Sequence, residues 1–436
     1  MTFADFGLSP EILETLNQQG YKAPTPIQTK AIPQVLQGND VMAAAQTGTG
    51  KTAGFVLPIA EKLSQGTPAK SNQARSLVLV PTRELASQVA DYAKTYSHNL
   101  GLRTTVVFGG VKINPQMMKL RKGVDVLVAT PGRLLDLYQQ NAVKFDQLEV
   151  LVLDEADRML DMGFINDISK ILALLPQKRQ NLMFSATFSN EIRKLSKVLF
   201  NNPVEISVNP QYTTATTVKQ WICPIDKKQK PALLIELIQQ HLWSHMLVFT
   251  KTKKGADRLT THLKHSGLKA AAIHGDKSQA IRTKTLADFK KGQIKILVAT
   301  DVAARGLDIE QLPQVINFDL PTVSEDYVHR IGRTGRAGST GEAVSLVSAD
   351  EFKELSAIER LIKKVLPRTL VDGFEPNHNV PESKLDTRPL KPKKPKKPKK
   401  PKTKNSASRH PIHDQEKSKS KAQSGLNLQV RKKPSN

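Results

Sequence analysis

The chain has 436 residues, which is enough for two or three ordinary domains with sizeable cores. Its net charge of +25 favours a polyanionic partner, either nucleic acid or an anionic membrane, over a surface charged only for solubility. The single cysteine, Cys223, excludes an internal disulfide and a cysteine-rich zinc site, and it fits a reducing compartment.

The sequence shows no signal peptide and no transmembrane stretch. Residues 1–13, MTFADFGLSPEIL, are acidic and lack a long apolar run. Elsewhere no segment approaches the ~20 apolar residues that a membrane span needs. We therefore expect a cytoplasmic protein without a membrane partner.

Short apolar runs rich in Val, Leu and Ile recur through the first half of the chain. They predict strands at 40–45, 76–82, 104–110, 124–130, 148–157 and 181–187. Near-continuous apolar runs of this length are typical of strands buried on both faces, as in a parallel sheet covered by helices. Helical segments such as 83–99 fill the intervals, so an α/β domain is predicted over residues 1–207.

A second series of strands follows a polar break. Residues 208–217, VNPQYTTATT, have no apolar periodicity and predict a flexible linker. Apolar runs then resume at 246–252, 270–275, 294–300, 314–321 and 341–347. The predicted fold class is therefore α/β, with a second parallel-sheet domain over 218–370.

The last segment, 371–436, is expected to be a disordered basic tail. Between Glu375 and Asn436 there are 18 Lys and Arg against five Asp and Glu. Residues 391–402, KPKKPKKPKKPK, have a proline at every third position and no core-forming residue between. This composition favours a solvated, extended chain until a partner binds it, and it leaves open whether the tail gives specificity or only affinity.

A loop with the sequence AQTGTGKT, residues 45–52, follows the first predicted strand and precedes a helix. Backbone N–H groups at a helix N-terminus cradle phosphates, although an unliganded helix cap is the alternative. Lys51 is expected to reach the β- and γ-phosphates of a nucleotide, and Thr52 to hold Mg²⁺. The rest of the loop would line the nucleotide: Ala45 (where the general pattern has glycine), Gln46, Thr47, Gly48, Thr49 and Gly50.

Acidic residues close the strand predicted at 148–157, within VLVLDEAD. Nucleotide hydrolases place a metal-side aspartate and a catalytic carboxylate beside the phosphate loop in this way. Asp154 is expected to bind Mg²⁺, and Glu155 to orient and deprotonate the attacking water. An acidic cluster alone is usually a solvated turn, but the phosphate loop upstream argues against that interpretation.

Together these motifs resemble a DEAD-box ATP-dependent RNA helicase, most closely the bacterial RhlE group. In the family's order the chain has GYKAPTPIQ (20–28), AQTGTGKT (45–52), PTRELA (81–86), TPGR (130–133), DEAD (154–157), SAT (185–187), ARGLD (304–308) and HRIGRTGR (329–336). The resemblance implies two tandem RecA-like domains that close over ATP and RNA. It also implies an RNA-dependent ATPase that unwinds short RNA duplexes or remodels RNA–protein complexes.

The resemblance assigns roles around the nucleotide as well. Tyr21 is expected to stack on adenine with support from Phe3. Gln28 is expected to hydrogen-bond the adenine edge, since a side-chain amide can pair with N6 and N7. Asp308 would contact the ribose. A further set would couple hydrolysis to domain closure: Asp157, Ser185, Thr187, His329 and Arg330.

The same resemblance implies an RNA-binding set. It comprises Thr82, Arg83, Gly110, Thr130 and Arg133 in the first domain, and Thr250, Arg282 and Thr300 in the second. Small polar residues and arginines suit phosphate and 2′-hydroxyl contacts, which position a strand without reading its sequence. Ribosomal or RNA-decay assemblies are possible partners, while the oligomeric state stays open.

The stretch HRIGRTGRAG, residues 329–338, carries three arginines at three-residue spacing. Such charges repel one another unless an anion lies among them, and residues 327–341 contain no carboxylate. The resemblance implies that the anion is the γ-phosphate of ATP. Arg333 and Arg336 would meet it when the domains close, and such arginines contribute ~10³–10⁵ in kcat.

Two other functions are alternatives to an RNA helicase. A DNA helicase or translocase could run on the same machinery, and ATPase stimulation by matched RNA and DNA oligomers would separate the two. A non-enzymatic RNA clamp acting through the basic tail is disfavoured by an intact Lys51 and Glu155, because a clamp has no use for a water-activating carboxylate.

Overall fold

The computed structural model describes residues 1–45, 48–186, 188–200, 202–208, 218–304, 307, 309, 312–335 and 341–385. Most of the predicted linker and the tail beyond residue 385 lie outside these ranges. So do five of the predicted site residues: Gln46, Thr47, Thr187, Asp308 and Arg336.

The first domain is built on a seven-stranded sheet with the order β3-β4-β2-β5-β6-β1-β7. All of its described strand pairs are parallel. Its strands are β1 (Val41–Ala44), β2 (Ala74–Leu79), β3 (Thr104–Val107), β4 (Val124–Ala129), β5 (Val150–Leu153), β6 (Gln180–Ser185) and β7 (Val204–Ser207). β1, β3, β4 and β5 lie within the predicted runs, β2 and β6 overlap theirs but begin two residues and one residue earlier, and β7 was not predicted.

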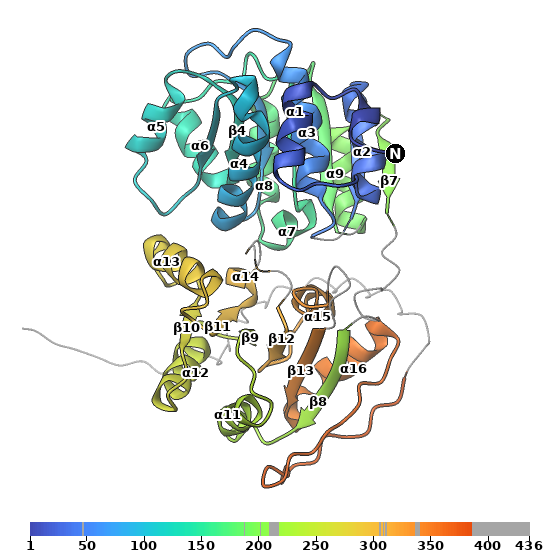
Figure 1. The fold of residues 1–436 in the computed structure, drawn as a ribbon, viewed down its shortest axis with the longest axis vertical. Coiled ribbons are helices and arrows are strands. Elements are labelled where there is room, and N and C mark those ends of the chain that lie inside the picture. The colour runs from blue at the N-terminus through green and yellow to red at the C-terminus, as the bar shows by residue number, and fades with distance from the viewer. Residues whose placement is uncertain are drawn as a thin grey trace, which may run out of the picture. The chain divides into compact units, whose positions relative to one another are not determined.

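Helices cover both faces of this sheet (Figure 1). Their bounds are α1 (Pro10–Gln18), α2 (Pro26–Leu36), α3 (Lys51–Ser64), α4 (Arg83–Ser97), α5 (Asn114–Leu120), α6 (Pro131–Gln139), α7 (Ala156–Asp161), α8 (Ile165–Leu174) and α9 (Asn190–Leu199), with short 3-10 turns at Ala4–Phe6 and His98–Leu100. Alternate strand residues enter two cores. Val78 and Val152 pack with helices α1 to α4, while Leu79 and Leu153 pack with the later helices.

The second domain has a six-stranded sheet with the order β10-β11-β9-β12-β13-β8, again parallel throughout its described pairs. Its strands are β8 (Val218–Pro224), β9 (Met246–Thr250), β10 (Ala270–Ile273), β11 (Ile296–Thr300), β12 (Gln314–Asn317) and β13 (Gly341–Val347). Its helices are α11 (Lys230–Gln240), α12 (Lys253–His265), α13 (Gln279–Lys290), α14 (Asp301–Ala304), α15 (Ser324–Ile331) and α16 (Phe352–Ile362), with a 3-10 turn at Ala349–Glu351. The predicted fold class, two tandem parallel-sheet α/β domains, is confirmed.

Chain beyond residue 370, which we expected to belong to the tail, packs on the second domain as far as Ser383. Val380 is buried in the core that includes α16. Arg368 Nη1 donates to the carbonyl of Val380 at 2.7 Å, and the N–H of Asn377 donates to Asp226 Oδ2 at 2.9 Å. A few apolar residues and one carboxylate therefore fix a segment whose composition alone suggested disorder.

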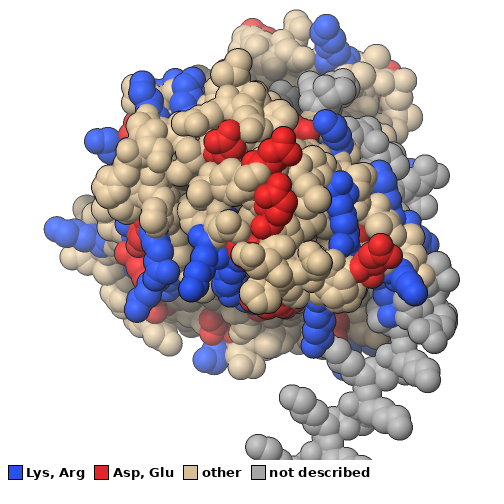
Figure 2. Space-filling view, turned by 90° about the horizontal axis from the view of Figure 1, so that it is seen from below, with Lys and Arg blue, Asp and Glu red and all other residues tan. Residues whose placement is uncertain are grey.

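Charged side chains of both signs share the face of the molecule seen from below (Figure 2). The positive excess is therefore not gathered into a single-sign patch on that face. No helix in the described ranges is long and apolar enough to cross a membrane.

Many of the predicted site residues lie at or just after the carboxyl ends of strands. In the first domain Ala45 follows β1, Thr130 follows β4 and Asp154 follows β5. In the second domain, Thr250 ends β9 and Thr300 ends β11. Because the carboxyl ends of parallel strands meet at one edge of a sheet, these residues of each domain lie along one edge, where α/β proteins bind ligands.

Candidate active site

The phosphate loop predicted at 45–52 joins β1 to α3, and Gly50 sets its geometry. Gly50 has φ +88°, a left-handed conformation that glycine adopts without strain. A Cβ at this position would lie 2.5 Å from Gln28 Nε2, so the close approach also requires glycine. Helix α3 begins at the next residue, Lys51, and its first N–H groups therefore belong to the loop.

Lys51 has a buried ammonium group. The residue is 7% exposed, and its Nζ makes no hydrogen bond within the described ranges. A buried cation in this condition is costly unless an anion joins it. A nucleotide's phosphates would supply that anion, so the residues present fit a phosphate chain.

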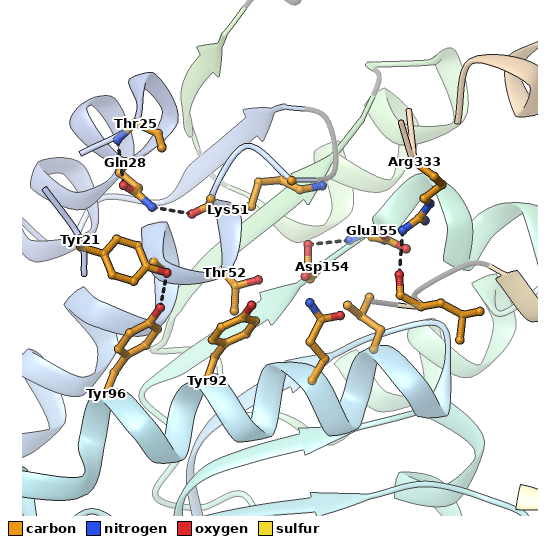
Figure 3. Close-up of a pocket in the computed structure, with 16 residues that line it drawn as sticks. Tyr21, Thr25, Gln28, Lys51, Thr52, Tyr92, Tyr96, Asp154, Glu155 and Arg333 are labelled. Atoms are coloured by element: carbon orange, nitrogen blue, oxygen red, sulfur yellow. Dashed lines mark hydrogen bonds between the residues drawn. The ribbon is translucent and has the colours of Figure 1, made fainter. Parts of the chain in front are cut away.

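Asp154 and Glu155 follow β5 at the same edge. Burial raises the pKa of Asp154 to about 6, and the nearby Lys51 opposes this rise. Glu155 has φ +51°, a conformation that costs a non-glycine residue on the order of 1–3 kcal/mol and that gathers at functional sites. Its N–H donates to Asp154 Oδ1 at 2.9 Å. Figure 3 shows Lys51 and both carboxylates around one cavity.

This cavity has a volume of about 300 Å³ and takes residues from both domains. Leu307 and Arg333 line it from the second domain. Arg333 Nη1 donates to the carbonyl of Leu307 at 2.7 Å, and the residue is 8% exposed. Arg333 thus lies at the same cavity as Glu155, as Figure 3 shows.

Aromatic residues line one part of the cavity. Tyr21 lies in the loop after α1, and Phe3 packs edge-on against its ring with centroids 6.0 Å apart. Tyr92 and Tyr96 of α4 line the same cavity. Sequence reasoning missed these two residues, although their spacing of four on the helix predicted at 83–99 places them on one face.

Gln28 is fully buried, and both ends of its amide are bonded within the protein. Its Oε1 accepts from the N–H of Thr25 at 2.8 Å, and its Nε2 donates to the carbonyl of Gly50 at 3.1 Å. Gln28 thereby ties the start of α2 to the phosphate loop. Contact with an adenine edge would require the amide to exchange at least one of these bonds.

The acidic motif and its neighbour Arg158 make contacts within the first domain and across to the second. Asp157 Oδ2 accepts from the N–H of Ala186, which links the predicted 154–157 and 185–187 motifs. The neighbouring Arg158 donates to Asp326 Oδ1 at 2.8 Å and contacts Nδ1 of His329, both on α15. Arg158 was not predicted, because no sequence pattern shows which distant residue an arginine will meet.

Arg330 is paired inside the second domain. Its Nε and Nη2 donate to the two carboxylate oxygens of Asp301 at 2.6 and 2.7 Å. Its Nη1 donates to Asn317, and the guanidinium lies 4.8 Å from the ring centroid of Phe249. The expectation that this arginine cluster lacks carboxylate partners is wrong for Arg330, because Asp301 lies 29 residues upstream, outside the 327–341 window.

In the first domain, the predicted RNA-binding residues lie beside α4 and α6. Thr82 caps α4, with its Oγ1 accepting from the N–H of Leu85 at 3.3 Å. The guanidinium of Arg83 lies against Gly110, which leaves no room for a Cβ there. Thr130 precedes α6, and Arg133 Nη2 donates to the carbonyl of Val111 at 3.0 Å.

In the second domain, Thr250 and Thr300 are both buried at strand ends. Arg282 on α13 forms an ion pair with Glu84 of α4, with Nη2 and Oε2 2.9 Å apart. Gln279 also donates to Glu84, at 2.9 Å. The predicted arginine is thus held by a carboxylate of the other domain, a partner that the sequence did not reveal.

Comparisons with known proteins identify the family. A family model described as DEAD/DEAH box helicase matches residues 25–195, and one described as helicase conserved C-terminal domain matches 229–338. The chain is 43% identical to the ATP-dependent RNA helicase CshA of Listeria monocytogenes over 362 residues, which cover 83% of this chain and 69% of that protein. It is 42% identical to the DEAD-box ATP-dependent RNA helicase CshA of Geobacillus kaustophilus over 388 residues, which cover 88% of this chain and 82% of that protein.

A solved structure of a related protein has the same two-domain fold. S. cerevisiae Dbp5 bound to RNA and ADP BeF3 matches with a TM-score of 0.74 at 31% identity, covering 85% of this chain and 96% of that one. The fold and the site thus define a two-domain RecA-like ATPase. The chain belongs to the DEAD-box ATP-dependent RNA helicase family, and it is an RNA-dependent ATPase that unwinds or remodels RNA through closure of its two domains.

The pairing of Arg330 gives a prediction about stability. Arg330→Met should lower the free energy of unfolding by about 3–5 kcal/mol, because it leaves the Asp301 carboxylate without its bidentate partner. The loss of unfolding free energy for Arg330→Lys should lie between zero and the loss for Arg330→Met. Urea denaturation followed by circular dichroism measures the change.

The matched control is Arg193→Met. Arg193 pairs with Glu205 at 3.5 Å, and both side chains are about half exposed. The free energy of unfolding of Arg193→Met should therefore fall by no more than about 1 kcal/mol. Equal effects of Arg330→Met and Arg193→Met would contradict the structural role given to Arg330.

Proposed function

We propose that ATP is hydrolysed in the cavity shared by Lys51, Asp154, Glu155 and Arg333. The observation that supports this proposal is the buried Lys51 ammonium, which has no hydrogen-bond partner among the described residues and lies near Asp154. Lys51 would bind the β- and γ-phosphates together with the N–H groups of the loop at 45–52. Glu155 would orient the attacking water and accept its proton.

We propose that Thr52 and Asp154 hold Mg²⁺. Within the described ranges no group of three or more His, Cys, Asp or Glu could hold a metal ion by itself. Mg²⁺ is commonly bound through one or two protein oxygens together with substrate phosphates, which fits a threonine and one buried carboxylate. When bound, the ion would neutralise charge on the phosphates.

At the other end of the nucleotide we propose a base and ribose site. Tyr21 would stack on adenine, with Phe3 packed against it, and Gln28 would contact the adenine edge. The line of aromatic rings beside the phosphate loop supports this assignment. Asp308 is proposed to contact the ribose on the grounds of family resemblance.

We propose that domain closure brings arginines to the γ-phosphate. Arg333 and Arg336 would meet the charge that develops there during transfer. A second group would couple this event to closure: Asp157, Ser185, Thr187, His329 and Arg330. The Arg158 contacts to Asp326 and His329 support a link between the acidic motif and α15.

We propose that RNA lies along the carboxyl edges of both sheets. Its backbone would meet Thr82, Arg83, Gly110, Thr130 and Arg133 of the first domain, and Thr250, Arg282 and Thr300 of the second. The Arg282–Glu84 ion pair supports the nearness of these edges to each other. Arg282 would have to share its guanidinium between Glu84 and a phosphate.

Finer assignments are also proposed. The sequence MAAAQTGTGKTAGFVLPI at residues 42–59 favours the RhlE group, while the relatives compared above are CshA proteins. We place the protein in the cytoplasm, with an RNA-binding tail and with ribosomal or RNA-decay assemblies as partners. Crosslinking to RNA in cells, with sequencing of bound fragments and mapping of crosslinked residues, tests these assignments; crosslinks absent from 388–436 would remove the tail from the RNA-binding surface.

Glu155→Gln tests the hydrolytic site. Binding of ATP should be retained, because the amide keeps the shape of the side chain. RNA-stimulated hydrolysis should collapse, because the amide cannot accept the proton. Steady-state ATPase assays and nucleotide binding on the same preparation measure both quantities. Glu191→Gln, which changes an exposed glutamate of α9, is the control. Parental turnover in Glu155→Gln would show that another group activates the water.

Arg333→Ala and Arg336→Ala test the closure arginines. Each variant should keep much of its nucleotide affinity and lose ~10³–10⁵ in RNA-stimulated kcat. Lysine should rescue poorly, because it lacks the planar fork of arginine. The control, Arg258→Ala, removes an exposed arginine of α12. ATPase at saturating RNA is the measurement, and turnover at the control's level in both variants would remove these arginines from the mechanism.

A further inference from the structure

A chain of aromatic rings runs from the N-terminus to the nucleotide cavity. Phe3 packs edge-on against Tyr21, and Tyr21 packs edge-on against Tyr96 with ring centroids 6.2 Å apart. Tyr96 in turn stacks on Tyr92 with centroids 6.1 Å apart and an interplanar angle of 10°. Three of these rings, those of Tyr21, Tyr92 and Tyr96, line the cavity (Figure 3).

The hydroxyl groups of Tyr21 and Tyr96 form a hydrogen bond of 2.7 Å. The residue Tyr96 is 2% exposed, and a buried phenol needs such a partner. Burial raises the pKa of Tyr96 well above its ordinary value. The Tyr96 hydroxyl therefore stays protonated and able to hydrogen-bond at any pH at which the protein works.

The two partners of this bond differ in how firmly the fold holds them. Tyr96 belongs to α4, whose inward face, including Leu85 and Val89, is buried in the first core. Tyr21 belongs to the loop between α1 and α2 and is only half-buried. Its ring is held by Phe3 on one side and by the Tyr96 hydroxyl at its tip. The Tyr96 hydroxyl, held by the packed helix α4, thus orients the ring of Tyr21 on its loop.

We propose that Tyr96 is a positioning residue of the adenine site, acting through its hydroxyl on the ring of Tyr21. Stacking on a base depends on the orientation of the ring, so a ring free to turn would lose part of its contact with adenine. Tyr96 would thereby contribute to the affinity for the base while leaving phosphate binding and chemistry unchanged. This inference rests on the proposed stacking role of Tyr21.

Tyr96→Phe tests the inference, because it keeps the ring and its packing and removes only the hydroxyl. The Kd of a non-hydrolysable ATP analogue should rise about threefold to tenfold, the range expected for one hydrogen bond. The Kd of inorganic tripolyphosphate, which has no base, should not change. RNA-stimulated kcat at saturating ATP should stay within about twofold of the parental value.

A double-mutant cycle locates the effect in the Tyr21–Tyr96 bond. Tyr21→Phe should raise the Kd of the analogue by about the same factor as Tyr96→Phe, and the double variant should be no worse than either. Tyr138→Phe is the matched control, since this tyrosine of α6 stacks on Phe145 and does not line the cavity.

The outcomes separate this inference from the proposed function. If Tyr21→Ala weakens analogue binding and Tyr96→Phe does not, only the inference fails. If Tyr21→Ala has no effect, the stacking role fails and the inference fails with it. Weaker binding of tripolyphosphate in Tyr96→Phe would also overturn the inference, because it would show a general loss of structure in the site.

Discussion

The buried ammonium of Lys51 is the feature on which the account of this site depends. It lies at the first residue of α3, near Asp154 and without a hydrogen bond in the described ranges. Leaving a buried cation in this state costs free energy that the folded chain must offset elsewhere. In the proposed site, the phosphates of a nucleotide would make this arrangement favourable. The raised pKa of Asp154 and the left-handed backbone of Glu155 are further unfavourable features at the place where we propose that the chemistry occurs.

Parallel topology explains how two separate domains share one site. Each sheet collects loops along one edge, so the phosphate loop and the acidic motif meet in the first domain, and the residues near Arg333 meet in the second. Ion pairs then join the two edges, Arg158 with Asp326 and Arg282 with Glu84. These pairs use residues adjacent to the motifs, so closure and site assembly depend on the same short segments.

The central strands and the motifs could be predicted from the sequence, but contacts between residues far apart in the sequence could not. Continuous apolar runs made the central strands visible, but β7 and β8 were missed because they are edge strands carrying polar residues such as Glu205 and Lys219. The bond between Tyr21 and Tyr96 joins residues 75 positions apart, and the partner of Arg330 lies beyond any local window. Motif order predicts which residues share a site, whereas their partners depend on the fold.

Thermal unfolding of Lys51→Met, with and without a non-hydrolysable ATP analogue and Mg²⁺, tests the central claim most directly. Without nucleotide, the Tm of the variant should equal or exceed the parental Tm, because the substitution removes a buried ammonium that makes no hydrogen bond to any described residue. With nucleotide, the rise in Tm seen for the parental chain should disappear, since ligand binding is what stabilises it. Lys178→Met, at an exposed position, should keep that rise. A variant with a lower Tm in the absence of nucleotide and an unchanged rise in its presence would contradict the account.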